Sequence, residues 1–429
     1  MRPTQRGWAI AAVALLLYFF ANQTQVGWLY VLSALAAGVW LTTGFLPRPM
    51  LRGLTLARRI NGQRSPERSD GESANPVELE LYAGETITVE LELTTTGRTP
   101  ALQVRGAEIC PLAPADERTQ SFFVPGLPPG ANVTLNYETT CARRGWFEFP
   151  PVALSTRAPF GFFSARRDIS APTGVLVFPE YRELKRLALF DRTPAAQNTF
   201  TRIGMGGEFV GVREYRPGDS PRHVHWRSTA RVGQLIVKEF AAETEPGLTI
   251  ALDLRGSSIV GFGENTSLEL AIKLVATLAR YAHQRGLPVS LVANSRTWPV
   301  PPGPLSWWGL MNTLARVQAD ANADESFADC LRGLRATSFV AAVLPSPDDD
   351  AIAPLVELKN QGLGVLAVVI DPNPFLPYGW GQSNQAEAVA GVLRAAGVEV
   401  VVVGNEPDWE ETLSADEAPV VHHGTRRER

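Results

Sequence analysis

Two apolar stretches at the start of the chain constrain its fold more than any other feature. The first covers residues 7–21 and the second residues 26–46, and neither contains a charged residue. A helix that crosses a bilayer needs about 20 apolar residues, with a range of about 17–25. The second stretch has this length, and the first is slightly short unless flanking residues complete it. Polar residues 22–25 separate the stretches as a short turn. Since both are too long and too apolar all round for core helices, they predict a transmembrane helical hairpin with spans at about residues 7–22 and 26–46.

The charges around the spans predict the orientation of this hairpin. Arg2 and Arg6 precede the first span, four arginines follow the second, and the turn has none. The four are Arg48, Arg52, Arg58 and Arg59. The positive-inside rule therefore predicts a two-pass protein of the cytoplasmic (inner) membrane with its soluble body on the cytoplasmic side. A signal peptide ending near residues 21–23 is the alternative, and it would export the body.

Size, charge and cysteine content bound the class of protein. A chain of 429 residues is expected to form two or three domains. Its net charge of −4 argues against a nucleic-acid partner, which usually meets a basic face. The three cysteines fit no zinc or C-x-x-C spacing, and so sparse a set suits a reducing compartment. A disulfide between Cys110 and Cys141 would require an exported domain.

After the hairpin region, residues 1–59, the composition changes twice. Residues 60–76 are polar and rich in glycine, serine and proline, which predicts a flexible linker. Residues 77–180 then show apolar and polar residues in alternation, with frequent turns, which predicts an all-β, immunoglobulin-like sandwich. The candidate strands are residues 77–81, 87–93, 133–137, 145–149 and 175–178. The aromatic stretch at residues 158–163 is interpreted as a loop packed under the sheet.

From residue 245 to 408 the pattern changes to strands that alternate with helices. This alternation predicts a parallel sheet with helices on both faces. The candidate strands are residues 248–253, 288–293, 339–344, 365–370 and 398–403, and the candidate helices are residues 268–285, 305–317, 351–361 and 385–396. Residues 181–244 are interpreted as a junction, and residues 409–429 as a disordered tail. The predicted fold class is therefore a multidomain α+β chain.

The most unusual stretch of the chain lies in the junction. Pro217 and Gly218 fit a type II turn, which Asp219 could hold. Four arginines near Glu214 and Asp219 could form bidentate pairs, and Trp226 could be a large apolar anchor. The arginines are Arg213, Arg222, Arg227 and Arg231. Two interpretations stay open: a network that locks the junction, or a surface that binds an acidic partner.

Two histidines in the same stretch raise a separate question. His223 and His225 would share one face of a strand, and two such histidines can ligate a metal ion. No third ligand stands at a recognisable spacing. The alternative, hydrogen-bonded polar residues in a strand and turn, is the expectation here.

This stretch resembles the signature of the domain-of-unknown-function 58 family, whose members are membrane-associated proteins. The resemblance rests on an Arg-Glu-Tyr triplet, a Pro-Gly-Asp triplet, an arginine four residues before a tryptophan, and an Ala-Arg pair. These are Arg213, Glu214, Tyr215, Pro217, Gly218, Asp219, Arg222, Trp226, Ala230 and Arg231, with His225 where the family often has aspartate. The resemblance implies a C-terminal domain similar to von Willebrand factor A and genes that neighbour those of MoxR-type AAA+ ATPases.

A von Willebrand factor A domain often binds a divalent cation through an Asp-x-Ser-x-Ser motif after its first strand, with hydroxyl and carboxylate oxygens as ligands. Here Asp253, Arg255 and Ser257 stand at those positions, and Asp348 is the candidate for the later carboxylate. A guanidinium cannot ligate a cation and repels it. We therefore expect a degenerate site and no cofactor, with Mg²⁺-dependent adhesion as the alternative.

Three common catalytic signatures are absent from the sequence. It has no G-x-S-x-G elbow, no H-E-x-x-H pair and no P-loop. The prediction is a membrane-anchored, non-enzymatic scaffold or adaptor that presents its α/β domain to a protein partner, by resemblance a MoxR-type ATPase. The alternatives are a metal-dependent binding module and an unrecognised enzyme.

Overall fold

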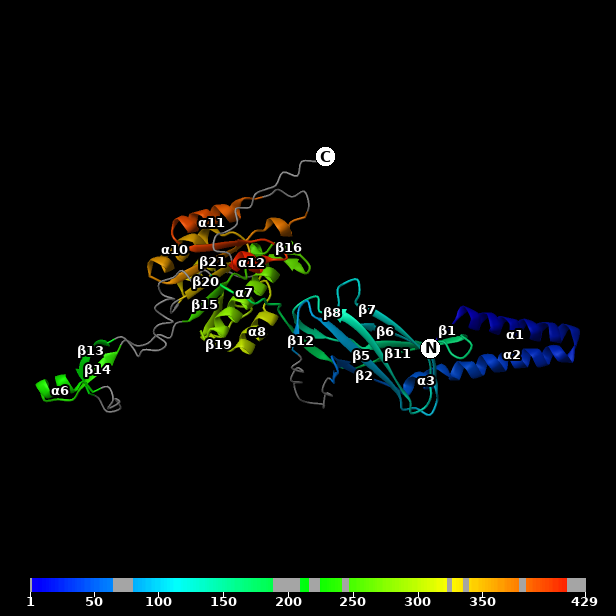
Figure 1. Cartoon of the computed structure of the whole chain (residues 1–429). Coiled ribbons are helices and arrows are strands. Elements are labelled where there is room, and N and C mark those ends of the chain that lie inside the picture. The colour runs from blue at the N-terminus through cyan, green and yellow to red at the C-terminus, as the bar shows by residue number, and fades with distance from the viewer. Residues whose placement is uncertain are drawn as a thin grey trace. The chain divides into compact units, whose positions relative to one another are not determined.

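The chain folds into two compact units, Met1–Phe178 and Pro179–Arg429, which run from blue to green and from green to red in Figure 1. Two apolar helices open the first unit, and several sheets and further helices follow. The predicted mixture of helices and sheets behind two apolar helices is thus confirmed. The computed structural model describes residues 2–64, 80–187, 209–215, 224–240, 247–321, 326–334, 339–377 and 383–414.

The two predicted spans form a pair of helices, α1 (Gln5–Thr24) and α2 (Gly27–Phe45), which contact each other (Figure 1). The hydroxyl of Thr4 caps α1 by accepting the N–H of Gly7 at 3.2 Å. Ser33 donates to a carbonyl of α1 at 2.8 Å, which satisfies a polar group among apolar neighbours. Both helices are long and apolar enough to cross a membrane, and most of their residues are not buried within the protein. These properties are compatible with membrane anchoring.

A short helix and three sheets make up the rest of the first unit. The strand orders are β3-β2-β5-β8, β4-β12-β9 and β1-β11-β10-β6-β7. The elements are β1 (Arg2–Pro3), α3 (Pro47–Arg52), β2 (Leu54–Ile60), β3 (Gln63–Arg64), β4 (Leu81–Tyr82), β5 (Thr86–Thr95), β6 (Ala101–Ile109), β7 (Thr119–Leu127), β8 (Asn132–Thr140), β9 (Gly145–Glu148), β10 (Val152–Thr156), β11 (Phe163–Ile169) and β12 (Gly174–Phe178). Alternate residues of β5 are buried, as the period-two pattern predicts.

Within the predicted sandwich region, residues 77–180, the strands β6, β7, β10 and β11 were not predicted. In β6 and β7 the glycine Gly106 and the proline Pro125 interrupt the alternation on which the prediction relied. Gly106 leaves room for the ring of Phe122, which would have to move if a Cβ were placed there, 1.9 Å away. The strands predicted from residues 87–93, 133–137, 145–149 and 175–178 correspond to β5, β8, β9 and β12.

The β region begins earlier than predicted. β2 pairs antiparallel with β5, so residues 54–59 belong to a sheet and not to the flank of the helical hairpin. Ile60 ends β2 with 1% of its surface exposed, and is therefore not in a linker. A single strand next to a polar segment carries too little pattern to be recognised without its partner. Residues 65–76 of the predicted linker, and residues 77–79 of the first predicted strand, lie outside the described residues.

Arg58 corrects the count of juxtamembrane charges. It lies in β2 and is buried, and its Nε donates to Oε1 of Glu108 at 2.7 Å. Both side chains are fully buried, and the guanidinium lies 4.3 Å from the ring centroid of Phe149. Arg59 in the same strand pairs with Glu92 at 3.2 Å. Arg58 is therefore not free to meet a membrane surface, and Arg59 is already paired with a carboxylate. The predicted orientation then depends on Arg2, Arg6, Arg48 and Arg52.

The second unit is built on a six-stranded sheet in the order β19-β18-β15-β20-β21-β22, parallel except for β19. Helices α9, α10 and α11 pack on one face, whose apolar core includes Ala251, Val340 and Leu355. Helix α7 contacts β15 and β20 and buries thirteen residues, so it covers the other face with α8 beside it (Figure 1). The predicted parallel sheet with helices is present, and an antiparallel edge strand is added.

The elements around this sheet are β15 (Leu248–Leu252), α7 (Ser267–Gln284), β18 (Val289–Ala293), β19 (Pro304–Leu305), α8 (Trp307–Arg316), α9 (Phe327–Arg332), β20 (Phe339–Leu344), α10 (Ile352–Asn360), β21 (Gly364–Ile370), α11 (Gln385–Ala395), β22 (Glu399–Val403) and α12 (Trp409–Ser414), with the small hairpin β16 (Gly261–Phe262) and β17 (Asn265–Thr266) and the 3-10 turns η2 (Gly256–Ser258), η3 (Asp349–Ala351) and η4 (Asn373–Phe375). The five parallel strands and the helices α7, α8, α10 and α11 follow the predicted segments closely, whereas α9, α12, β16, β17 and β19 were not predicted.

The predicted disordered tail is wrong for its first residues. Trp409 and Leu413 of α12 are buried, with 3% and 1% of their surface exposed. The guanidinium of Arg182 lies 4.8 Å from the ring centroid of Trp409 and pairs with Glu410. The pattern was missed because a helix of six residues has too few apolar positions to show a period. Residues 415–429 lie outside the described residues.

Candidate functional site

The strongest candidate site lies at the carboxyl edge of the parallel sheet, between β15 and β20. From β15 the chain crosses to β18 on one side and later returns to β20 on the other. In open α/β sheets, ligands bind outside the carboxyl ends of the strands where the strand order reverses in this way. Asp253 directly follows β15, and Asp348 follows β20 by a short loop. The fold thus brings two predicted site residues together at the switch point.

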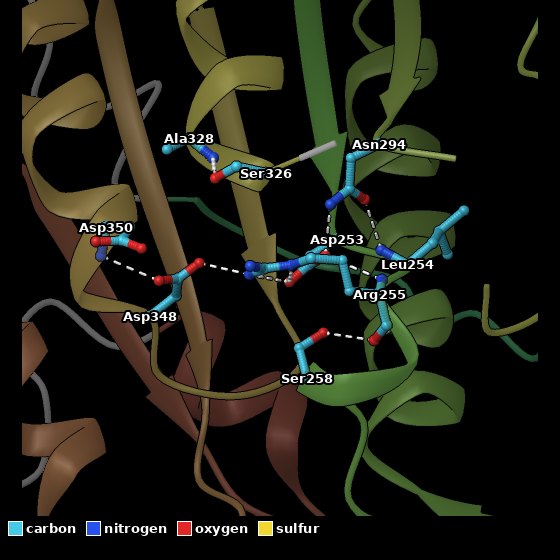
Figure 2. A network of polar contacts seen from close by, with 9 residues as sticks. All are labelled: Asp253, Leu254, Arg255, Ser258, Asn294, Ser326, Ala328, Asp348 and Asp350. Atoms are coloured by element: carbon cyan, nitrogen blue, oxygen red, sulfur yellow. Dashed lines mark hydrogen bonds and ion pairs between the residues drawn. The ribbon is translucent and has the colours of Figure 1, made fainter. Parts of the chain in front are cut away.

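Arg255 bridges these two carboxylates, as Figure 2 shows. Its Nη2 lies 2.8 Å from Oδ2 of Asp253 and 2.5 Å from Oδ2 of Asp348. Its Nε also donates to both carboxylate oxygens of Asp253, at 3.1 and 3.2 Å. The two-pronged contact with Asp253 uses the planar fork of the guanidinium, which a lysine ammonium lacks.

The surroundings hold Asp253 in place. Its side chain is 1% exposed, and its Oδ1 accepts hydrogen bonds from the backbone N–H of Arg255 at 3.1 Å and from Nδ2 of Asn294 at 2.8 Å. Asn294, at the end of β18, also accepts the N–H of Leu254 through its Oδ1 at 2.8 Å (Figure 2). A buried carboxylate is stable only when it is paired and hydrogen-bonded, and Asp253 is both. Asn294 is a site residue that the sequence analysis missed.

The loop that carries Arg255 is itself fixed on both sides. The N–H of Gly256 donates to the carbonyl of Asp320 at 2.9 Å, and the Oγ of Ser258 donates to the carbonyl of Arg255 at 2.8 Å. A Cβ on Gly256 would lie 3.2 Å from the backbone of Ala321, so a larger residue would push the loop outward. The guanidinium is therefore presented to the two aspartates by a constrained backbone.

This arrangement does not fit a divalent cation. The guanidinium occupies the space between the two carboxylates that a cation would need, and its own charge would repel one. Hydrogen bonds to Asp253 raise the pKa of Arg255 above its ordinary value, with burial opposing and Asp348 adding to the effect, so the charge persists at every physiological pH. Within the described ranges, no group of three or more His, Cys, Asp and Glu side chains is placed to hold a metal ion.

The hydroxyls at the edge are arranged differently from the predicted motif. Ser257 is exposed in η2, and no hydrogen bond joins it to Asp253, Arg255 or Asp348 among the described residues. Its neighbour Ser258 is the buried hydroxyl of this loop. Asp348 also caps η3, since its Oδ1 accepts the N–H of Asp350 at 3.0 Å.

The arginine-rich stretch forms a separate small element of the second unit. Strands β13 (Phe209–Glu214) and β14 (Ile236–Phe240) pair antiparallel, and helix α6 (Trp226–Val232) lies between them in the sequence. Arg213, Glu214 and Tyr215 lie at the end of β13 or just after it, and Ala230 and Arg231 lie in α6. Pro217, Gly218, Asp219, Arg222 and His223 lie outside the described residues.

His225 has a role that the sequence analysis did not predict. It is the N-cap of α6: its Nδ1 accepts the N–H of Ser228 at 3.2 Å and lies 2.7 Å from the Oγ of Ser228. Its own N–H donates to the carbonyl of Ile236 in β14 at 2.8 Å. His225 therefore does not lie in a strand, as a His-x-His pair on one strand face would require. A side chain that caps a helix terminus satisfies an otherwise unpaired N–H, which explains a polar residue just before Trp226.

The surface of this hairpin is apolar and basic. Trp226, Val232 and Leu235 are 68%, 59% and 46% exposed. Arg227 and Arg231 of α6 are also exposed and form no ion pair with any residue that the structure describes. We name this set, Trp226, Arg227, Arg231, Val232 and Leu235, the motif surface. Arg227 and Arg231 have no carboxylate partner among the described residues. The Nη1 of Arg213 donates to the carbonyl of Glu214 at 3.0 Å.

Fold and site together define a mixed α and β protein with two N-terminal apolar helices and an arginine-closed edge on its parallel sheet. Residues 211–325 match the family model described as "Protein of unknown function DUF58". The match covers this part of the chain, and the resemblance drawn from residues 213–231 is confirmed. The match extends from β13 through the motif surface and the loop of Arg255 to the end of α8 and beyond.

Other comparisons add no functional information. No curated protein matches the chain. A GH20 exo-β-N-acetylglucosaminidase from Vibrio harveyi is 8% identical over 82% of this chain, which spans 57% of that enzyme, with a TM-score of 0.20. A β-glucosidase from Paenibacillus barengoltzii is 11% identical over 82% of this chain and 51% of its own length, with a TM-score of 0.13. At these TM-scores, neither structure supports an inference about fold or function.

Proposed function

We propose that the protein is a membrane-anchored, non-enzymatic adaptor that holds its α/β domain at the cytoplasmic face and offers the motif surface to a protein partner. The two apolar helices support the anchor, since each is long enough to cross a bilayer. Four exposed arginines, Arg2, Arg6, Arg48 and Arg52, flank the spans on the side of the soluble body and support the cytoplasmic orientation.

The α/β domain in this proposal is of the von Willebrand factor A type, and the β region before it is an immunoglobulin-like sandwich. In the sheet of the α/β domain, β15 lies beside β20, and the antiparallel strand β19 lies at the edge. This strand order supports the assignment to the von Willebrand factor A type. The paired sheets around shared apolar clusters support the assignment of the β region to an immunoglobulin-like sandwich. Because Arg255 occupies the carboxyl edge, the domain acts without the cation that this class often uses.

The observation that carries the proposal is the exposed motif surface. Trp226 is 68% exposed in this chain. An exposed tryptophan of this kind is typical of a residue that becomes buried when a partner binds. Two exposed arginines lie in the same helix, and Trp and Arg are the residues most enriched among those that dominate binding energy. A basic and aromatic surface fits a partner with an acidic surface around an apolar pocket. The partner that we propose is a MoxR-type AAA+ ATPase.

The test is a binding measurement with the full chain in lipid nanodiscs and a MoxR-type ATPase from the same source. We expect Trp226→Ala to weaken binding by at least tenfold, as loss of a central aromatic contact does. Phe262→Ala is the matched control, because Phe262 of β16 is 72% exposed but lies outside the motif surface. Binding should also weaken with added salt, because Arg227 and Arg231 are exposed to screening.

Two results would overturn the proposal. Failure of the ATPase to bind at any salt concentration, even under crosslinking, would remove the partner. Equal loss of binding in Trp226→Ala and Phe262→Ala would remove the motif surface as its site. The orientation has its own test: in spheroplasts an external protease should leave the body intact until the membrane is opened, and immediate cleavage would place the body outside.

A further inference from the structure

The loop between β10 and β11, residues 157–162, is bound tightly to the base of the helical hairpin. The N–H of Thr4 donates to the carbonyl of Phe162 at 2.9 Å, and its hydroxyl donates to the carbonyl of Gly161 at 2.6 Å. A Cβ on Gly7 would lie 2.2 Å from the carbonyl oxygen of Phe162, so only glycine allows this approach. The aromatic stretch predicted to pack under the sheet therefore meets the apolar helices.

Contacts on the second helix continue this junction. The rings of Trp40 in α2 and Phe163 at the start of β11 have centroids 5.3 Å apart. Strand β1, just before α1, pairs with β11 through Arg2–Ser164 and Pro3–Phe163. The loop and the start of β11 are thus held by both helices of the hairpin and by the residues that precede them.

The length of α1 sets the depth of the loop. Its 20 residues span about 30 Å at 1.5 Å per residue, which equals the thickness of the hydrocarbon layer. Thr4 then lies at one boundary of that layer. Gly7 lies about 4.5 Å further along α1, and Trp40 about 7.5 Å from the end of α2. Since the loop touches Gly7 and the first residue of β11 touches Trp40, this part of the β region reaches the boundary between headgroups and hydrocarbon.

The chemistry of the loop fits that boundary. Phe160 is 60% exposed and its ring centroid lies 5.9 Å from that of Phe162. Exposed arginines gather at the same end of the unit, and such residues attract anionic headgroups. They are Arg2, Arg6, Arg48, Arg52 and Arg157. Aromatic side chains beside basic ones are typical of segments that lie in a membrane interface.

We infer that this loop is a third membrane contact, in which Phe160 inserts into the interface of an anionic bilayer and fixes the β region against the membrane. The inference rests on the proposed membrane anchor and adds the surface by which the soluble body meets lipid. The β region is then rigidly docked on the bilayer and not suspended from the helices by a flexible linker.

The experiment places an environment-sensitive NBD probe at single introduced cysteines in the full chain, reconstituted in nanodiscs that contain phosphatidylglycerol. The native cysteines Cys110, Cys141 and Cys330 are buried, and the unsubstituted chain measures their background labelling. Three positions are compared: Phe160→Cys in the loop, Leu35→Cys in the middle of α2, and Ile109→Cys. Leu35 and Ile109 are 62% and 49% exposed, so all three accept the probe.

Ile109 is a matched control because it lies at the far end of the same sheet. Val104 pairs with Thr156 next to the loop, and Ile109 lies five residues further along β6, about 17 Å away. Lipids with a nitroxide near the headgroup or deep in the acyl chain act as quenchers. We expect the probe at Phe160 to be quenched at least twofold more by the shallow nitroxide than by the deep one. The probe at Leu35 should be quenched more by the deep nitroxide. The probe at Ile109 should be quenched by neither.

The outcomes separate the inference from the proposed anchor. If the probe at Leu35 is not quenched, the hairpin does not span and the proposed anchor fails. If the probe at Leu35 is quenched while the probe at Phe160 behaves like that at Ile109, the anchor holds and the inference is wrong. A second measurement avoids the probe: a water-soluble maleimide should react several-fold more slowly with Phe160→Cys in nanodiscs than in detergent, and an unchanged rate would overturn the inference.

Discussion

Replacing Arg255 by serine removes the positive charge that joins Asp253 to Asp348. Asp253 would remain buried with its side chain 1% exposed, and it would face a second carboxylate without an intervening cation. Removal of one partner from a fully buried ion pair costs roughly 3–5 kcal/mol, because the other charge stays desolvated. The side chains of Arg255 and Asp348 are 21% and 13% exposed, so solvent screens part of this loss. We expect a loss of about 2–3 kcal/mol in the local stability of the sheet edge.

Divalent cations should reverse part of this loss in the variant. With a serine at this position, the two carboxylates and the new hydroxyl resemble an oxygen site for a hard cation. For a dissociation constant of about 1 mM, 10 mM Mg²⁺ would add about 1.4 kcal/mol through its preference for the folded state. The unsubstituted protein should show no such gain, because its guanidinium already occupies the site. Arg255→Lys should lie between the two, since an ammonium keeps the charge and loses the fork.

The assay is hydrogen exchange of the full chain in nanodiscs, read on peptides that contain β15 and β20. Exchange reports the free energy of local opening, so the second unit is measured without unfolding the hairpin. Arg332→Ser is the matched control: its pair with Asp329 is exposed at 54% and 60%, and such pairs contribute about 0–1 kcal/mol. Equal protection of β15 in Arg255→Ser and Arg332→Ser would refute the view that Arg255 replaces a cation at this edge.

Three further predictions follow from other parts of the fold. Glu108→Gln should lower the free energy of unfolding of the β region by roughly 3–5 kcal/mol in urea unfolding, because it leaves the Arg58 charge buried without its partner. The double change Arg58→Met with Glu108→Leu should restore most of that loss, because it removes both charges. A double variant as unstable as Glu108→Gln would contradict this. Burial raises the pKa of the Cys110 thiol and raises that of Cys141 to about 12, so neither should react with iodoacetamide at pH 8 until the protein unfolds, as mass spectrometry would show. Burial and a neighbouring arginine of α7 lower the pKa of His283. Because the unfolded state then binds the proton more readily, the free energy of unfolding should fall as pH drops below about 6.5. In urea unfolding between about pH 7 and 5, His283→Gln should show a smaller dependence of this free energy on pH, and an unchanged dependence would contradict the prediction.

Local patterns were sufficient for the longer helices and for the parallel strands of the second unit. The segments at residues 339–344 and 385–396 were predicted almost to the residue, because a run of apolar residues and a 3.6-residue period are visible without knowledge of the neighbours. The same holds for the two apolar helices and for the family motif at residues 213–231. Short elements such as α12 and strands interrupted by glycine or proline carry too little period to be recognised.

The sequence by itself determined that Arg255 stands where a cation-binding motif would have a serine, and that Asp253 and Asp348 were the carboxylates to consider. Only the tertiary structure decided that Arg255 contacts both, because Asp348 is 93 residues away and reaches it through the pairing of β15 with β20. Arg58 shows the same limit: it reads as a juxtamembrane charge until Glu108, 50 residues away, is placed beside it. Secondary structure follows from near neighbours, whereas the state of a charged side chain depends on the partner and burial that chain topology provides.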